Sequence, residues 1–190
     1  TGAKLHICHL STAGSVEIVR AAKSRGVAVT AEVTPHHLML TEDLTASFDP
    51  RYKVNPPLRH DSDVQALRHA VADGTIDIIA TDHAPHPSES KDCAFDEAAF
   101  GMVGLEMALR VVHDALVTPG HLDWAGVARV LAVNPARIGQ LEGYQVPFAP
   151  GAPAHLTLYD PGAPPAGHTR YTRSTNNPYH HLDLGGQVSY

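Results

Sequence analysis

Short apolar segments alternate with segments of helical periodicity through the first two thirds of the 190-residue chain. Short apolar runs suit buried strands, and apolar residues three or four apart suit helices that cover a sheet. This order predicts a parallel sheet with helices packed on it, as in a (β/α)8 barrel or an open doubly wound fold. The expected strands are residues 4–10, 27–33 and 76–82, and the expected helices are residues 13–26, 61–74, 104–116 and 123–138.

The composition limits the class of protein. With 43% hydrophobic and 18% charged residues, the chain suits a folded globular protein rather than a disordered one. A net charge of −6 offers no basic surface for nucleic acid. We see neither the roughly 18 apolar residues of a membrane span nor a signal segment. Only two cysteines occur, Cys8 and Cys93, so we expect no disulfide framework and a cytoplasmic protein.

The composition changes after Leu141, where proline and glycine become frequent and helical periodicity ends. We therefore expect two parts: residues 1–141 as part of the barrel and residues 142–190 as a segment of a small β lobe. Alternating apolar residues between 155 and 160 predict a half-buried strand in this lobe. The apolar side chains that we expect the lobe to bury are Leu156, Leu158, Leu182, Leu184 and Val188.

Side chains that bind metals follow the predicted strands. Asp82 ends the third strand, and an aspartate there would by itself equally suit a helix cap or a buried ion pair. The carboxyl ends of parallel strands meet at one edge of a sheet, however, so other strand-end residues could join it. Imidazole and carboxylate groups are the usual ligands of a catalytic zinc ion. The side chains that could converge are His9, Glu32, His36, His37 and Asp82.

Five motifs, in this order and at these spacings, resemble the class I dihydroorotases of the amidohydrolase superfamily. They are "HICHLST", "AEVTPHHL", "YKVNPPLR", "TDHAPH" and "AFGMVGLE". The later "NPARI" and "PGAPAHLTLYDP" are similar to the C-terminal part of the same enzymes. Related allantoinases and hydantoinases tend to replace the final histidine of "TDHAPH", so His86 favours a dihydroorotase.

The resemblance implies a zinc-dependent (β/α)8 barrel with a small β lobe. Such enzymes interconvert N-carbamoyl-L-aspartate and dihydroorotate in pyrimidine biosynthesis. Matched by motif, His9 corresponds to a zinc ligand, and Asp82 corresponds to both a zinc ligand and the catalytic acid/base. A histidine such as His86 can hold the substrate carboxylate by a charge-assisted hydrogen bond. The positions that match substrate-contacting residues are Asn55, His86, Phe100 and Gly101.

Two other histidines adjoin the motif residues without matching ligands. Strand alternation turns His83 away from the side of Asp82, which favours a supporting role. A spacing of three residues places His6 on the strand face opposite His9.

The loop and accessory residues receive more general expectations. We expect His36 and His37 to pack or to anchor their loop, while Glu32 and Cys8 could bind an accessory metal ion. The complete site of the family holds one or two zinc ions.

Several parts of the family pattern have no counterpart in this chain. The missing parts are a His-x-His pair, a bridging carboxylate (Asp or carboxylated Lys), a further histidine, and an arginine and an asparagine for the substrate carboxylate. The chain therefore resembles the C-terminal half of a dihydroorotase. We expect an N-terminal half to complete the barrel, since a half barrel would expose its apolar interior, and we expect this chain to be inactive by itself. The family also suggests a homodimer and aspartate carbamoyltransferase as partners.

Two other functions stay open at the level of sequence. One is a hydantoinase or allantoinase, which would depend less on His86. The other is a catalytically silent dihydroorotase-like partner of aspartate carbamoyltransferase, which would bind no zinc. Both "HICHLS" and "TDHAPH" argue against the silent partner, because a scaffold has no need to keep metal ligands.

Overall fold

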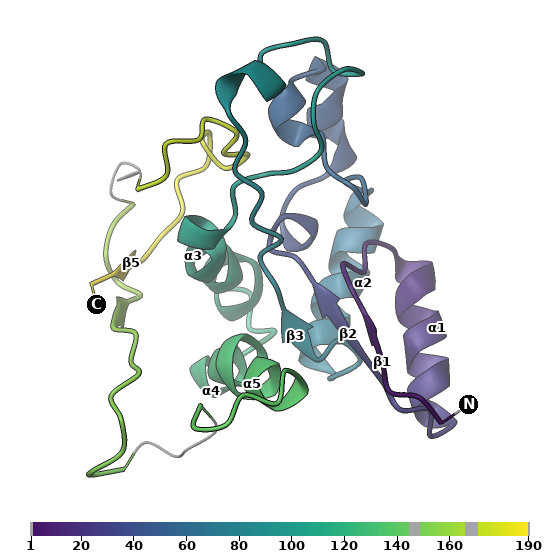
Figure 1. Ribbon diagram of the computed structural model, residues 1–190, viewed down its shortest axis with the longest axis vertical. Helices are drawn as coiled ribbons and strands as arrows, with labels where there is room; N and C mark the ends of the chain where they lie inside the picture. The colour runs from purple at the N-terminus through teal and green to yellow at the C-terminus, as the bar shows by residue number, and fades with distance from the viewer. Residues whose placement is uncertain (1, 145–148, 166–170, 190) are drawn as a thin grey trace.

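The computed structural model describes residues 2–144, 149–165 and 171–189 (Figure 1). Its larger sheet has three parallel strands in the order β1–β2–β3, with helices packed against them, so the predicted α/β fold is confirmed. The strands of this sheet are β1 (Leu5–Ile7), β2 (Val29–Val33) and β3 (Ile78–Ile79). The α-helices are α1 (Ala13–Ser24), α2 (Asp61–Ala72), α3 (Ala108–Val112), α4 (Trp124–Ala128) and α5 (Asn134–Ile138).

The later helices match the predicted stretches to within one residue at each end but change their hydrogen-bond pattern along their length. A 3₁₀ turn at Leu105–Met107 leads into α3, which continues as a π turn over His113–Val117. Similarly, α4 passes through a π turn at Arg129–Val133 into α5. In Figure 1, α1 lies beside the β1 end of the sheet, and α4 and α5 lie near β3.

Local signals explain where α1 begins and ends. The Thr12 side chain accepts a hydrogen bond from the Ser15 N–H, and the Ser15 hydroxyl accepts one from the Thr12 N–H, which forms a capping box. Gly26 follows the helix with a φ of 76°, a conformation that glycine adopts without strain. The predicted helix at residues 13–26 is therefore confirmed in position and nearly in length.

The start of α2 differs from the expectation that Asp61 or Ser62 caps it. His60 is the capping residue, and its side chain makes no capping hydrogen bond. Asp61 and Asp63 instead lie in the first turn, where carboxylates interact favourably with the helix dipole. Asp63 Oδ1 also accepts a hydrogen bond from the Ala13 N–H at 2.8 Å, which joins the first turns of the two helices.

The strands are shorter than the apolar runs that predicted them. The first and third runs continue to Leu10 and Asp82, yet β1 ends at Ile7 and β3 at Ile79. After each of these two strands the chain leaves the sheet through a residue in the left-handed conformation, His9 with φ 55° and Asp82 with φ 45°. Residues in this conformation cannot continue a β ladder, so the ladder stops short of the residues at its edge.

Two hydrophobic clusters make up the core. The first lies between the sheet and the helices and includes Val16 and Val19 of α1, Ala31 and Val33 of β2, and Leu67 of α2. The second packs loop residues and part of the α3 region against the C-terminal segment. Its buried members are Leu40, Tyr52, Val54, Leu58, Met102, Met107, Val111, Tyr179 and Leu184.

The described residues of the C-terminal part, 149–165 and 171–189, form less β structure than expected. A two-stranded antiparallel sheet joins β4 (Tyr159–Asp160) to β5 (Gln187–Val188). The expected burial holds for Leu184 and in part for Leu182, which pack on the second cluster. It is wrong for Leu156, Leu158 and Val188, which are 46%, 58% and 45% exposed, because two residue pairs make too small a sheet to cover them.

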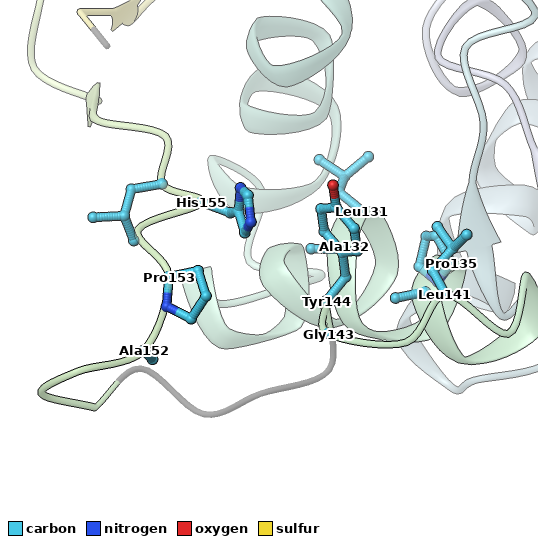
Figure 2. Close-up of a pocket in the computed structure, with 11 residues that line it drawn as sticks. Leu131, Ala132, Pro135, Leu141, Gly143, Tyr144, Ala152, Pro153 and His155 are labelled. Atoms are coloured by element: carbon cyan, nitrogen blue, oxygen red, sulfur yellow. The ribbon is translucent and has the colours of Figure 1, made fainter.

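A cavity of about 390 Å³ lies between the end of the helical region and residues 152–156 (Figure 2). His155 stacks on Tyr144 at its side, with ring centroids 4.9 Å apart. The lining of the cavity is mostly aliphatic and contains none of the predicted site residues. Among the residues that the structure describes, no helix is long and apolar enough to cross a membrane.

Candidate metal and substrate site

His9 and Asp82 meet at the carboxyl edge of the sheet, as predicted. His9 follows β1 and Asp82 follows β3, and their side chains approach with Nε2 of His9 3.8 Å from Oδ1 of Asp82. Both residues hold the left-handed backbone conformation that costs a non-glycine residue about 1–3 kcal/mol. Strain of this kind gathers at functional sites, so the two positions are unusual in their backbones as well as in their side chains.

The distance between these two side chains suits a shared metal ion. Nitrogen and oxygen ligands of tetrahedral zinc lie about 3.4 Å from each other, close to the separation found here. A catalytic zinc site takes three protein ligands. Within the described part of the chain, no third ligand residue is grouped with His9 and Asp82. The pair therefore fits part of a metal site and leaves room for ligands from elsewhere.

Glu32 of β2 lies next to Nδ1 of His9, the ring nitrogen that does not face Asp82. Its side chain is 8% exposed, and its Oε1 lies 2.8 Å from Nδ1 of His9. This approach lacks the alignment of a hydrogen bond, so within the described part of the chain Nδ1 is a buried nitrogen without a hydrogen-bond partner. Where a carboxylate accepts a hydrogen bond from the second nitrogen of a metal-binding imidazole, it orients the ring. Here Glu32 lies on the Nδ1 side of His9, and Nε2 is the ring nitrogen that faces Asp82.

His6 does not lie on the face opposite His9, so that expectation is wrong. Its Nε2 lies 3.0 Å from Oε2 of Glu32, and its Nδ1 lies 2.8 Å from Oγ1 of Thr30. Both histidines therefore contact the same carboxylate. Alternation fails because β1 ends at Ile7 and the chain turns at His9, which brings the later side chain back toward β2.

His6, Cys8 and Glu32 form the one group of three potential metal ligands found among the described residues, with ligand atoms within 4.8 Å of one another. The accessory-metal hypothesis for Glu32 and Cys8 therefore has some geometric support. Two features disfavour it. Burial and then the Glu32 carboxylate raise the pKa of the Cys8 thiol, which disfavours the thiolate that binds metals. Both ring nitrogens of His6 also already have partners.

His83 has the supporting position expected of it. Its Nδ1 accepts hydrogen bonds from the N–H groups of Gly104 and Leu105, both at 3.2 Å. Since Nδ1 accepts, the ring proton is on Nε2. His83 therefore ties the segment after β3 to the loop that carries Phe100 and Gly101.

His86, Phe100 and Gly101 come together next to this pair of loops. Nε2 of His86 lies 2.9 Å from the Phe100 carbonyl oxygen, and because a carbonyl only accepts, Nε2 donates. The other ring nitrogen, Nδ1, is then the one left to face a substrate. The Phe100 side chain is 58% exposed, and Lys53 lies over its ring at 4.7 Å from the centroid.

Gly101 allows the two loops to approach this closely. Its φ is 130°, and a Cβ at this position would lie 2.6 Å from Cβ of Ala84 and 3.1 Å from Nε2 of His86. We expect Gly101→Ala to cost about 3 kcal/mol of unfolding free energy, from backbone strain and overpacking together. Gly74→Ala is the matched control, because Gly74 also has a positive φ of 82° but has nothing within 4 Å. Urea unfolding measures both, and equal costs would contradict the steric role of Gly101.

Asn55 is exposed on a neighbouring loop. The Lys53 carbonyl, two residues earlier, accepts a hydrogen bond from the Gly101 N–H at 3.0 Å, so this loop adjoins the loop of Phe100. His37 anchors it from below, with Nε2 3.1 Å from the Pro56 carbonyl and 3.3 Å from the Pro57 carbonyl. The expectation of a loop-anchoring role is thus confirmed for His37.

His36 is buried and packs against His37, with ring centroids 4.5 Å apart. Neither of its ring nitrogens has a hydrogen-bond partner among the residues that the structure describes. Burial, followed by the neighbouring His37, lowers the pKa of His36 well below its usual value. His36 is therefore a neutral packing residue at neutral pH, which agrees with the packing role expected of it.

Sequence reasoning missed two buried polar residues that hold the site loops. One is Lys91, whose Nζ donates to the carbonyls of Pro50, Lys53 and Ala99 at 3.0, 3.3 and 2.7 Å. Burial and then Lys53 lower its pKa to about 8. The other is Asn176, which is 1% exposed. No local pattern marks either residue, because their partners lie far away in the sequence.

Known proteins similar in sequence to this chain are dihydroorotases. No family model matches the chain. The chain is 59% identical to a dihydroorotase of Leifsonia xyli subsp. xyli over 98% of its own length and 43% of the relative. It is 60% identical to a dihydroorotase of Streptomyces coelicolor, over 100% and 45%. A dihydroorotase of Mycobacterium tuberculosis is 48% identical, over 99% and 44%.

Solved structures of hydantoinases have the same fold over this region. An L-hydantoinase (dihydropyrimidinase) of Arthrobacter aurescens matches 86% of this chain and 37% of its own with a TM-score of 0.78 and 29% identity. A D-hydantoinase (dihydropyrimidinase) of Thermus sp. matches 100% and 43%, with a TM-score of 0.82 and 27% identity. The dihydroorotases are much more similar in sequence. By sequence the chain is therefore similar to dihydroorotases along nearly its whole length, and it spans a little under half the length of the curated relatives that it matches.

Proposed function

We propose that this chain is part of a zinc-dependent cyclic amidohydrolase that interconverts N-carbamoyl-L-aspartate and dihydroorotate in pyrimidine biosynthesis. The observation that carries the proposal is the meeting of His9 and Asp82, both left-handed, at one edge of the sheet. The high identity to dihydroorotases supports the choice of reaction. In this proposal residues 1–141 belong to a (β/α)8 barrel and residues 142–190 to a small β lobe, in a cytoplasmic enzyme.

The remaining ligands would come from a part of the protein that this chain does not contain. The chain spans 43–45% of the dihydroorotases named above, which supports a missing portion. That portion would supply the His-x-His pair, the bridging carboxylate and a further histidine, so this chain alone would be inactive. A homodimer and a complex with aspartate carbamoyltransferase are further partners that the family suggests.

The residues of this chain would divide the chemistry among them. When bound, the zinc ion would polarise the ring carbonyl and activate water. Asp82 would accept a proton from the attacking water and return it to the departing ring nitrogen. In its doubly protonated form, His86 would donate Nε2–H to the Phe100 carbonyl and Nδ1–H to the substrate carboxylate. Asn55 and the backbone of Gly101 would contact the ring.

The first test is turnover of dihydroorotate by the protein in which this chain is joined to the rest of a dihydroorotase, supplied with zinc. We expect turnover there and none with this chain alone. Stoichiometric zinc without turnover would refute the proposal. A protein with neither zinc nor turnover would instead be the silent partner of aspartate carbamoyltransferase.

A hydantoinase is the second candidate, because the two solved structures named above are hydantoinases. His86→Ala separates the two, since a carboxylate is present on dihydroorotate and absent from simple hydantoins. For a dihydroorotase we expect a loss in kcat/KM of about 100-fold, the value of one charge-assisted hydrogen bond. Assays on dihydroorotate and on hydantoin measure it, with His60→Ala at an exposed position as the control. An equal loss on both substrates would contradict carboxylate binding by His86.

A further inference from the structure

The segment 171–177 crosses the two loops that carry most of the proposed substrate contacts. Asn176 is its most buried side chain, at 1% exposure. Its Nδ2 donates to the Ala84 carbonyl at 2.9 Å and to the Gly101 carbonyl at 3.1 Å. Its Oδ1 accepts from the His86 N–H at 3.4 Å. One amide group therefore bonds both loops at once.

The backbone of Asn176 adds to this connection. Its carbonyl accepts a hydrogen bond from the Val103 N–H at 3.1 Å. The two loops also contact each other directly, through the Ala84 N–H and the Met102 carbonyl at 2.9 Å. Three sets of hydrogen bonds therefore hold the two loops together: those of the Asn176 side chain, that of its backbone carbonyl, and the direct bond between the loops. Of the residues involved, Asn176 comes from a distant part of the chain.

The bonding pattern requires an amide at position 176. Two carbonyl oxygens need donors and one N–H needs an acceptor, and among small side chains only an amide offers both. A carboxylate of the same shape would place negative charge against two carbonyl oxygens. Buried polar groups left without partners are costly, so the position depends on the chemistry of the side chain as well as its volume.

The same segment contacts His86 from its other side. The Ser174 hydroxyl donates to the His86 carbonyl, while Asn176 accepts from the His86 N–H. Both backbone polar groups of His86 are therefore bonded by residues of one segment, and its ring is bonded by Phe100. His86 has little freedom left to move relative to Gly101.

We infer that Asn176 is a positioning residue, which fixes His86 relative to the Phe100–Gly101 backbone and so sets the geometry of the substrate carboxylate subsite. This inference rests on the proposed function. Asn176 itself touches neither the metal pair nor the reacting atoms in this arrangement; it acts through His86 and Gly101. Misplacing a positioned group by about 1 Å can cost as much as 100-fold in activity.

The decisive comparison is between Asn176→Ala and Asn176→Asp in the full-length, zinc-loaded protein. We expect each to raise KM for dihydroorotate by about 10-fold or more, with zinc content unchanged. Asn176→Asp should be at least as impaired as Asn176→Ala, since it keeps the shape and loses the donors. Wild-type KM in both variants would overturn the inference, as would an Asp variant close to wild type, which would mean that shape alone matters.

Asn177 supplies a matched control. It is the next residue, 4% exposed, and its Oδ1 accepts from the Tyr179 N–H of its own turn at 2.9 Å. Asn177→Ala is expected to lower stability and the active fraction while leaving KM unchanged. A merely structural role for Asn176 would produce the same result as Asn177→Ala, so a KM shift in both variants would also overturn the inference.

Two further measurements keep the outcome clear. If the Asn176 variants do not fold, Ser174→Ala removes only one hydroxyl, and we expect a KM increase of about 3-fold, in line with one weakened hydrogen bond.

If the wild-type protein does not turn over dihydroorotate, the proposed function fails, and amide hydrogen exchange decides the inference. Faster exchange at His86 and Val103 in Asn176→Ala, but not in Asn177→Ala, would support it; unchanged exchange would overturn it.

Discussion

Replacing Asp82 with asparagine is expected to lower kcat for dihydroorotate by about 10³- to 10⁴-fold, the upper range for a lost general acid/base. Asparagine has the same shape but cannot take up the proton and is a poorer metal ligand. Its amide would also face Nε2 of His9, 3.8 Å from the present carboxylate oxygen. The measurement is steady-state turnover of the full-length protein, with bound zinc determined in parallel so that the loss of metal and the loss of proton transfer are separated.

Asp77 offers the control for this substitution, because it precedes the same strand at its opposite end. Its Oδ2 accepts from the Ala31 N–H at 2.8 Å and pairs with Nζ of Lys23 at 2.7 Å. Asp77→Asn keeps an acceptor for Ala31 and loses the ion pair, so we expect reduced stability and kcat within about 3-fold of wild type. Retention of a tenth or more of wild-type kcat by Asp82→Asn would rule out its role as the acid/base.

The convergence of His9 and Asp82 could be predicted because it follows from a general property of parallel sheets. Each residue lies near the end of an apolar run, and the carboxyl ends of such strands share one edge. The local chain direction was less predictable. Alternation assumes a strand that continues, and β1 ends at Ile7, so the expected position of His6 was wrong. Where a strand ends depends on its neighbours, which a single segment does not reveal.

Long-range polar contacts account for most of what the sequence could not indicate. Asn176 bonds partners 75 to 92 positions away, and Lys91 bonds carbonyls in two different loops. Neither residue lies in a periodic pattern, and backbone carbonyls carry no sequence identity at all. Similarly, alternation suggested burial of Leu158, but burial requires a covering surface, and the two-stranded sheet at that position provides little.

Acidification is expected to destabilise the fold through His37. Burial lowers its pKa from 6.5 to about 4, against the opposing effect of its bonds to the Pro56 and Pro57 carbonyls. Between these pH values the unfolded chain binds a proton that the folded chain does not, so unfolding becomes easier as pH falls. The stability from His37 is complete above about pH 6.5 and is lost toward pH 4, a difference of about 3 kcal/mol. His36 contributes with the same sign.

His37→Gln tests this origin, because its amide can still donate to the Pro56 carbonyl but does not titrate in this range. We expect the variant to be less stable than wild type at pH 7 and to lose about 3 kcal/mol less on acidification to pH 4. Urea unfolding of metal-free protein at both pH values measures this and excludes metal release as the cause. His155→Gln, the same replacement at an exposed histidine, is the control for the substitution itself. An unchanged profile in His37→Gln would show that acid acts elsewhere, whereas a flattened one would assign the loss to the imidazole that anchors the loop of Asn55.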